Sequence, residues 1–435
     1  MERREVERDK NMVVVEYEFS EREVDIAEDK AARYLNQRIE LPGFRKGKIP
    51  KNVLKIRLGE DFKEYVLDEL LEEALKEEKL LENILLRPIV IERKIEGDKA
   101  LVKIEFHLEP EVKVPDYSGI ELKAVSKGEV LDKYIEKRLE DLREEHALVE
   151  PKDGEAQYGD MVKVRMVVTN DEGKVIRDEE YEYILVEDDD RPFVKDLIGK
   201  KKGDVVEFDR EYEGKNFHYK IDLLEVYKRT LPELNDEFAK TVGNEFETLE
   251  KLKEHLKKEG SGIYDREMRE VLRDQALDWL VENVELEISE KTLEKFVESA
   301  VDKLKKEGNY EKYVEKYESE EKLREFLRNY YLNDLKTEFG IKKVAELEGI
   351  KITEEDLEKE AEELSVLWGI SKERAKVLVK NKEDIRNDLE WVLLKRRTLD
   401  AIVDKANVVE LSEEEYRKAM GGEEVERGSA EDNEQ

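Results

Sequence analysis

The sequence has 435 residues, of which 45% are charged and 39% hydrophobic, and its formal net charge at pH 7 is −34. A chain of this length exceeds what one hydrophobic core supports, so we expect two to four domains with thin cores and an elongated outline. The acidic balance argues against a protein that coats nucleic acid, because phosphate binding rests on Lys and Arg, although one concentrated basic site remains compatible with it. The absence of cysteine excludes disulfides, zinc–thiolate sites and thiol nucleophiles.

The sequence also lacks the patterns that are typical of a metal site, a membrane span or a signal peptide. The four histidines are scattered, without the spacing of metal ligands: His107, His146, His218 and His255. No apolar run approaches the length of a membrane span, and no long apolar stretch follows the charged N-terminus, as a signal peptide would require. We therefore expect no metal, no cofactor, no membrane association and a cytoplasmic location.

The first predicted domain covers residues 1–111 and has an α+β pattern. Residues 12–19 favour a strand, and the pair Ser20 and Glu23 forms a capping box that opens a helix. That helix should bury side chains at helical spacing: Val24, Ala27, Ala31, Tyr34 and Leu35. A second helical stretch follows, with its apolar stripe at Phe62, Val66, Leu70, Leu71 and Leu75. Two strands, at 88–96 and 100–108, close the domain around a turn at Gly97.

The rest of the chain divides by periodicity. Residues 112–150 contain a linker and a helix that Ser126 caps, and residues 151–228 contain short alternating strands that predict a small antiparallel β domain. Residues 229–420 are almost wholly helical, and the polar, acidic segment 421–435 is typical of a disordered tail. The predicted fold class is therefore α+β and multidomain, with a β domain inserted into a helical domain.

A basic loop stands out near the N-terminus, because no acidic residue occurs between Leu41 and Gly59. The same stretch contains six cations: Arg45, Lys46, Lys48, Lys51, Lys55 and Arg57. Gly43 and Gly47 allow sharp turns, and Pro50 can begin the next helix. Phe44 lies beside two of the cations, a combination that suits a surface of RNA phosphate and protein. From charge alone, a solvated loop that balances acidic neighbours explains the pattern equally well.

The sequence Gly43-Phe44-Arg45-Lys46-Gly47-Lys48-Ile49-Pro50 resembles the ribosome-docking motif of trigger factors, Gly-Phe-Arg-x-Gly-x-x-Pro, at all five fixed positions. The resemblance extends along the whole chain. It implies a ribosome-binding domain (1–111), a linker with the first helix of the chaperone domain (112–150), an inserted isomerase domain (151–228) and a helical chaperone domain (229–420). It also implies that Phe44, Arg45 and Lys46 contact ribosomal protein and RNA of the large subunit beside the exit tunnel.

The β segment is similar to an FKBP-type peptidyl-prolyl cis-trans isomerase domain, which trigger factors usually carry. Such a site is an apolar pocket that receives the proline ring and lowers a rotation barrier of about 20 kcal/mol, without nucleophile or metal. Five residues fall where the family places pocket lining: Met166, Ile176, Tyr183, Phe193 and Tyr219. The alternative is that these side chains are simply core.

Three departures from the FKBP pattern predict a weak isomerase, and no catalytic side chain is singled out. Arg177 stands where the family has Asp, and Asp189-Asp190 replaces an apolar pair whose backbone binds the substrate carbonyl. The loop that covers the pocket is reduced to residues 211–215. The acidic run 187–190 is more typical of a solvated loop than of a calcium site. A fully active isomerase is the alternative.

Seven aromatic residues of the helical segment could provide exposed apolar patches for unfolded chains, although ordinary helix packing accounts for them as well. They are Tyr310, Tyr313, Tyr317, Tyr330, Tyr331, Trp368 and Trp391. The resemblance implies a ribosome-associated chaperone that shields nascent and unfolded polypeptides, with at most weak self-association off the ribosome. A structural scaffold of charged helices is a further alternative, and the basic loop counts against it.

Overall fold

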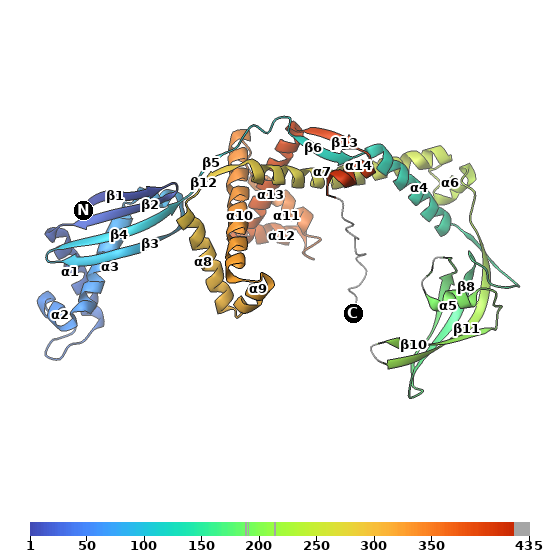
Figure 1. Ribbon diagram of the computed structural model, residues 1–435, viewed down its shortest axis with the longest axis horizontal. Coiled ribbons are helices and arrows are strands. Elements are labelled where there is room, and N and C mark those ends of the chain that lie inside the picture. Colours follow the sequence, from blue (N-terminus) through green and yellow to red (C-terminus); the bar gives the residue numbers. More distant parts are fainter. Residues whose placement is uncertain (188, 190, 213–214, 422–435) are drawn as a thin grey trace. The chain divides into compact units, whose positions relative to one another are not determined.

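The computed structural model, drawn in Figure 1, describes residues 1–187, 189, 191–212 and 215–421. The chain divides into two compact units. The first unit comprises Met1–Leu122 and Val271–Val408, and the second comprises Lys123–Glu270 with the residues from Val409 onward. Of the tail predicted at 421–435, only residue 421 belongs to the described residues.

A four-stranded antiparallel sheet in the order β1-β2-β4-β3 opens the first unit. Its strands are β1 (Glu2–Asp9), β2 (Met12–Phe19), β3 (Ile84–Glu96) and β4 (Lys99–Leu108). The three strands predicted from alternation are confirmed, and Gly97 makes the β3–β4 turn with a φ of +63°. Strand β1 was not predicted, because all of its residues are exposed and most are charged, so it has no apolar alternation.

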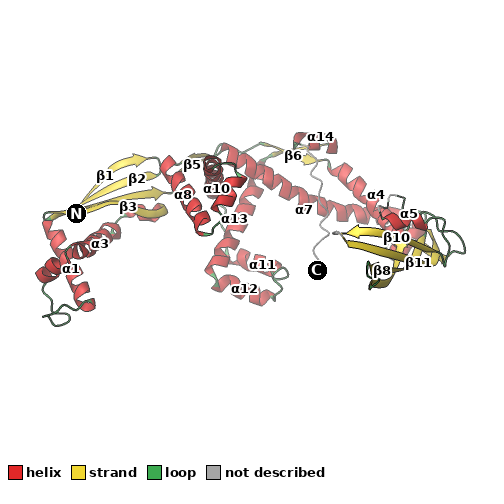
Figure 2. Cartoon of the chain, turned by 60° about the horizontal axis from the view of Figure 1, so that its bottom comes forward, coloured by secondary structure: helices red, strands yellow, loops and turns green. Residues whose placement is uncertain are grey.

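Helices α1 (Glu21–Arg38) and α3 (Glu60–Lys76) cover one face of this sheet (Figures 1 and 2). Helix α2 (Lys51–Leu58) packs against α1 and α3, and a short 3-10 helix, η1 (Lys79–Asn83), follows α3. The capping box of Ser20 and Glu23 is present as predicted. Gly59, with a φ of +54°, divides the second helical stretch into α2 and α3. The core between sheet and helices includes Tyr17, Phe62 and Phe106.

The burial predicted for Tyr34 is wrong. Its side chain is 40% exposed, and its ring lies 5.6 Å from that of Tyr65 on α3, with the Arg38 guanidinium 3.6 Å above it. The spacing of Tyr34 follows the apolar stripe of α1, but a neighbouring ring and a guanidinium satisfy this amphipathic side chain at the surface.

Helices make up the remainder of the first unit. They are the C-terminal part of α7 (Leu249–Asn283), α8 (Glu290–Lys306), α9 (Tyr310–Lys316), α10 (Glu320–Glu348), α11 (Glu354–Leu364), α12 (Lys372–Asn381) and α13 (Glu383–Lys405). Two short strands, β5 (Glu111–Lys113) and β12 (Glu285–Glu287), pair with each other. A buried polar network joins β4 to α8: Nδ1 of His107 lies 2.8 Å from the Thr292 hydroxyl, and Asn11 accepts from the backbone N–H of Ser289.

The second unit contains a five-stranded antiparallel sheet, drawn in yellow in Figure 2. Its strands are β7 (Leu148–Pro151), β8 (Met161–Asn170), β9 (Val175–Ile184), β10 (Val205–Tyr212) and β11 (Lys215–Thr230), in the order β10-β11-β8-β9 with β7 on β11. Its helices are α4 (Lys127–Glu145), α5 (Pro192–Leu197), α6 (Asp236–Val242), the first part of α7 and α14 (Glu413–Ala419). Strands β6 (Glu121–Val125) and β13 (Asn407–Leu411) fall at the boundaries between the units.

The predicted fold class, α+β and multidomain, is confirmed. An α/β domain comes first, a β-rich domain is inserted between α4 and α6, and the C-terminal part is helical. Within the described ranges, none of the helices combines the length and the apolar character that a membrane span needs.

Candidate functional site

The basic loop connects α1 to α2 and is fixed to the domain at one buried point. Ile49 is buried, and the Asn36 side chain holds its backbone from both sides: the Asn36 amide donates to the Ile49 carbonyl at 2.9 Å and accepts from the Ile49 N–H at 2.8 Å. Residues 42–48 are all exposed. The loop is therefore a solvent-facing tip on a rigid base, and sequence reasoning did not single out Asn36.

Two successive turns shape the tip. The N–H of Phe44 donates to the carbonyl of Leu41 at 3.2 Å, and the N–H of Lys48 donates to the carbonyl of Arg45 at 3.0 Å. Gly43 and Gly47 stand third in the two turns, with φ of +92° and +78°, where a residue with a Cβ is strained. The space around both glycines is open, so the conformation, and not crowding, requires glycine there.

Ion pairs with nearby carboxylates make the net positive charge of this segment smaller than its composition suggests. Carboxylates of α1 neutralise two of the three cations of α2: Lys51 pairs with Asp29 at 2.8 Å, and Lys55 pairs with Glu28 at 2.5 Å. Lys46 lies 3.5 Å from Glu40. Among the described residues, three cations of this segment form no ion pair: Arg45, Lys48 and Arg57. Phe44, 40% exposed, lies beside Arg45 at the tip.

In the β domain, four of the five expected lining residues belong to one cluster. Met166 and Phe193 are buried, and Tyr183 and Tyr219 pack against them partly buried. The Tyr183 ring is 5.2 Å from Phe193, which faces Phe208 at 6.4 Å, and Phe208 stacks on Tyr219 at 4.9 Å. Sequence reasoning missed Phe208, although it alternates with Val206 on β10.

The structure does not bring Ile176 to this cluster. Its side chain is 55% exposed. The register of the β8–β9 ladder shifts between Arg177 and Val175, and Ile176 lies at that shift. The bulge displaces the side chain from the alternation that the sequence suggested. Arg177 itself is exposed and lies 4.0 Å from Glu179.

A cation covers the aromatic cluster. The Arg191 guanidinium lies 4.6 Å from the centre of the Tyr183 ring and 5.6 Å from that of Phe193. Its Nε donates to Asp189 at 2.8 Å, and this hydrogen bond lowers the pKa of the Asp189 carboxyl to about 2. Asp189 is thus neutralised by Arg191 and does not oppose an apolar ligand as a bare charge. Asp190, the other half of the expected acidic pair, lies outside the described residues.

The described residues of the segment expected as a shortened cover loop belong to strands β10 and β11. Strands β10 and β11 pair as far as Tyr212 and Lys215, and residues 213 and 214 lie outside the described residues. The described part of the chain contains no group of three or more His, Asp or Glu that could hold a metal ion.

The helical part carries a chain of aromatic rings that begins at Tyr317, directly after α9, and continues along α10. The Tyr317 ring is 4.5 Å from Phe326, Phe326 is 6.4 Å from Tyr330, and Tyr330 is 5.3 Å from Tyr331. Tyr310 is partly buried beneath Lys305, and Tyr313 is exposed. Phe326 and Tyr330 line a cavity of about 330 Å³ together with polar residues of α10. Trp368 packs against the core of α11, α12 and α13, and Trp391 is partly buried.

Comparison with known proteins gives concordant matches along the chain. A family model described as "Bacterial trigger factor protein (TF)" matches residues 1–142, and one described as "Bacterial trigger factor protein (TF) C-terminus" matches residues 248–404. The sequence is 57% identical over 411 residues to the trigger factor of Thermotoga maritima, with 94% of this chain and 96% of that protein covered. It is 46% identical over 421 residues to the trigger factor of Kosmotoga olearia, with 95% of each covered.

A solved structure is similar to this chain over nearly its whole length. It is described as "Promiscuous Substrate Recognition in Folding and Assembly Activities of the Trigger Factor Chaperone". The TM-score is 0.81 at 56% sequence identity, with 93% of this chain and 99% of that chain covered.

Proposed function

The chain belongs to the trigger factor family, and on that premise we propose that it docks on the large ribosomal subunit through residues 43–50 and shields polypeptides that leave the exit tunnel. One observation carries the docking proposal: in a chain of net charge −34, an exposed aromatic side chain and unpaired cations share one tip on a rigid base. A protein that acts there lies in the cytoplasm.

The chemistry of the tip suits a surface of mixed RNA and protein. Phe44 offers an apolar anchor, and Arg45 offers a planar guanidinium that recognises phosphate or carboxylate in a bidentate manner. Lys46 and Lys48 add positive charge on either side of Gly47. Gly43, Gly47 and Pro50 have a different role, because they set the backbone that presents these side chains.

Exposed apolar groups of the helical part support the binding of nascent and unfolded polypeptides. Val366 and Leu367, between α11 and α12, are 84% and 81% exposed, and Phe326 and Tyr330 are exposed on α10. Separate apolar patches on a highly charged surface can hold many different unfolded chains weakly. The charge of −34 opposes association between copies of the chain, so self-association off the ribosome should be weak.

As a second activity we propose weak peptidyl-prolyl isomerisation in the β domain. The cluster of Tyr183, Phe193, Phe208 and Tyr219 offers ring faces to a proline. The guanidinium of Arg191 covers two of those rings and must be displaced before an apolar residue can enter. The alternative, a fully active isomerase, requires that this displacement cost little.

The test of docking is co-sedimentation with ribosomes. Replacement of Phe44, Arg45 and Lys46 by alanine should abolish binding at moderate salt while circular dichroism stays unchanged, because the tip is exposed and its anchor at Ile49 is untouched. The binding of the unaltered chain should weaken with rising salt, since cations meet phosphate or carboxylate. Undiminished binding by a correctly folded triple variant would remove the proposal.

A further inference from the structure

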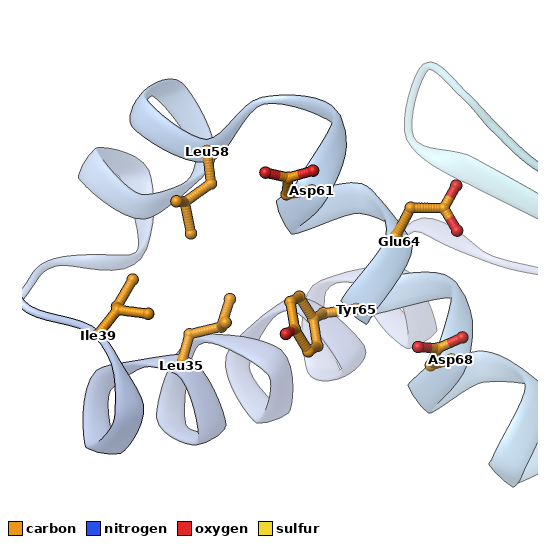
Figure 3. A pocket seen from close by; sticks show the side chains of 7 residues that line it. All are labelled: Leu35, Ile39, Leu58, Asp61, Glu64, Tyr65 and Asp68. Atoms are coloured by element: carbon orange, nitrogen blue, oxygen red, sulfur yellow. The ribbon is translucent and has the colours of Figure 1, made fainter.

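The N-terminal domain contains a cavity of about 440 Å³ beside the base of the docking loop. Figure 3 shows its apolar walls: Leu35 and Ile39 come from the end of α1, Leu58 from the end of α2 and Tyr65 from α3, and their side chains converge on one hollow. The volume lies in the range of sites that hold several side chains or a small ligand. The cavity is close to the base of the docking loop, because Ile39 directly follows α1 and the loop connects α1 to α2.

The rim of this cavity is acidic. Asp61, Glu64 and Asp68 line it from one face of α3, as their spacing of three and four residues requires. Arg93 of β3 pairs with Glu64 and with Asp68, each at 2.5 Å. Asp61 is exposed and forms no ion pair with any residue that the structure describes. Three carboxylates against one guanidinium leave two negative charges at the rim.

An apolar floor below an acidic rim fits one kind of side chain particularly well. Lys and Arg carry an apolar stem that packs along hydrocarbon and a cationic head that seeks carboxylates. The exposed ring of Tyr65 adds a face over which a cation is attracted. An RNA backbone is excluded as occupant, because its phosphates would meet the carboxylates of α3.

We propose that this cavity binds a Lys- or Arg-bearing segment of a ribosomal protein that flanks the docking position of the loop. The inference rests on the proposed docking function and deepens it. The docking face then carries both signs of charge: cations at the tip for phosphate or carboxylate, and carboxylates at the cavity for basic protein. Complementary charges at two separate points fix the orientation of the domain on the ribosome, whereas contact at the tip alone leaves that orientation free.

A photo-cross-linking experiment on the full-length protein identifies the occupant. Tyr65 is replaced by p-benzoylphenylalanine, which is close to it in shape, and the protein is irradiated with non-translating ribosomes. We expect cross-links to a ribosomal protein, mapped by mass spectrometry to a segment that contains Lys or Arg. Phe44 replaced by the same residue reports docking independently.

Each outcome of the cross-linking decides between the two proposals. Cross-links at position 44 without any at position 65 would overturn this inference and leave docking intact. Cross-links from position 65 only to ribosomal RNA, or only to the nascent chain once translating ribosomes are used, would also overturn it. Absence of cross-links at both positions would contradict the docking proposal and with it the cavity's role.

Charge reversal supplies a second test with a matched control. Asp61→Lys should weaken ribosome binding by about three- to tenfold, the range for one partly exposed charge pair together with the repulsion that replaces it. Glu60→Lys makes the same change in the same turn of α3 at a residue that does not line the cavity, and it should alter binding less than about twofold. Equal effects of both variants, or tighter binding by Asp61→Lys, would overturn the proposal.

Discussion

The docking loop and the aromatic face of the β domain are the two regions that we propose bind another molecule, and they are constructed in different ways. The loop is local in sequence: residues within one short stretch make both turns, and the Asn36 side chain and the buried Ile49 tie it to the domain. The aromatic face is assembled from β9, α5, β10 and β11, and residues far apart in sequence contribute one ring each.

This difference decides how each region responds to change. In the loop, two glycines at positive φ set the backbone that presents the exposed side chains, so we expect glycine and proline to matter as much for docking as those side chains do. In the β domain, the backbone is an ordinary sheet, and accessibility of the rings depends on one side chain, Arg191, which lies over them. Four predictions test this contrast, in order of expected effect.

Removal of the β domain should abolish the activity proposed for one region and leave that of the other unchanged. Leu148 pairs with Thr230 in the antiparallel ladder of β7 and β11, so the two ends of the segment lie side by side. A variant in which a short Gly-Ser linker replaces residues 148–230 should lose all isomerase activity and keep its ribosome affinity. Co-sedimentation and a protease-free isomerisation assay measure the two properties. An unfolded variant would show that the inserted domain is not independent.

The loop should be sensitive to changes that remove no contact at all. Gly43→Ala and Gly47→Ala each place a Cβ at a positive φ, which costs about 1–2 kcal/mol and should weaken ribosome binding about tenfold. Gly262→Ala is the control, since Gly262 lies within α7 with open space around it. That substitution should leave docking unchanged and raise thermal stability slightly. Equal docking by all three variants would contradict a backbone-defined site.

The aromatic face should respond in the opposite direction, by gaining activity when a side chain is removed. The double variant Arg191→Ala with Asp189→Asn uncovers Tyr183 and Phe193 without leaving a bare carboxylate, and we expect kcat/KM for a short proline peptide to rise about three- to tenfold, the equivalent of one cation–ring contact. Arg177→Ala is the control, because Arg177 is exposed and outside the cluster. A loss of activity in the double variant would mean that the guanidinium helps to bind the substrate.

The smallest expected effect is that of pH on the covered face. The hydrogen bond from Arg191 lowers the pKa of Asp189 from 3.8 to about 2, so the stability of this pair is fully present above the ordinary pKa and is lost only as pH falls toward 2. Isomerase activity should therefore vary less than about twofold between pH 5 and 8. A transition within that range, measured with a pH-independent peptide substrate, would place another titrating group at the rings.

Local signals in the sequence were sufficient to predict several elements of the first domain. The capping box at Ser20, the turn at Gly97 and the three strands predicted for the first domain depend on neighbours in the chain, and all are confirmed. The predicted family is confirmed as well. The errors lie where neighbours in space decide: β1 pairs without any apolar pattern, and Tyr34 is exposed against Tyr65. The division into domains at 111, 150, 228 and 420 and the roles of the site residues stay predictions.

The sequence by itself determined where the docking loop turns and where the next helix begins, because glycine at positive φ and proline at a helix start are local requirements of the backbone. Only the tertiary structure decided which charges that loop can offer. Lys51 and Lys55 read as part of the basic segment, yet carboxylates of α1 neutralise them. The same holds for Asp189 under Arg191 and for the acidic cavity below the loop, since charge and cavity arise from pairs that folding brings together.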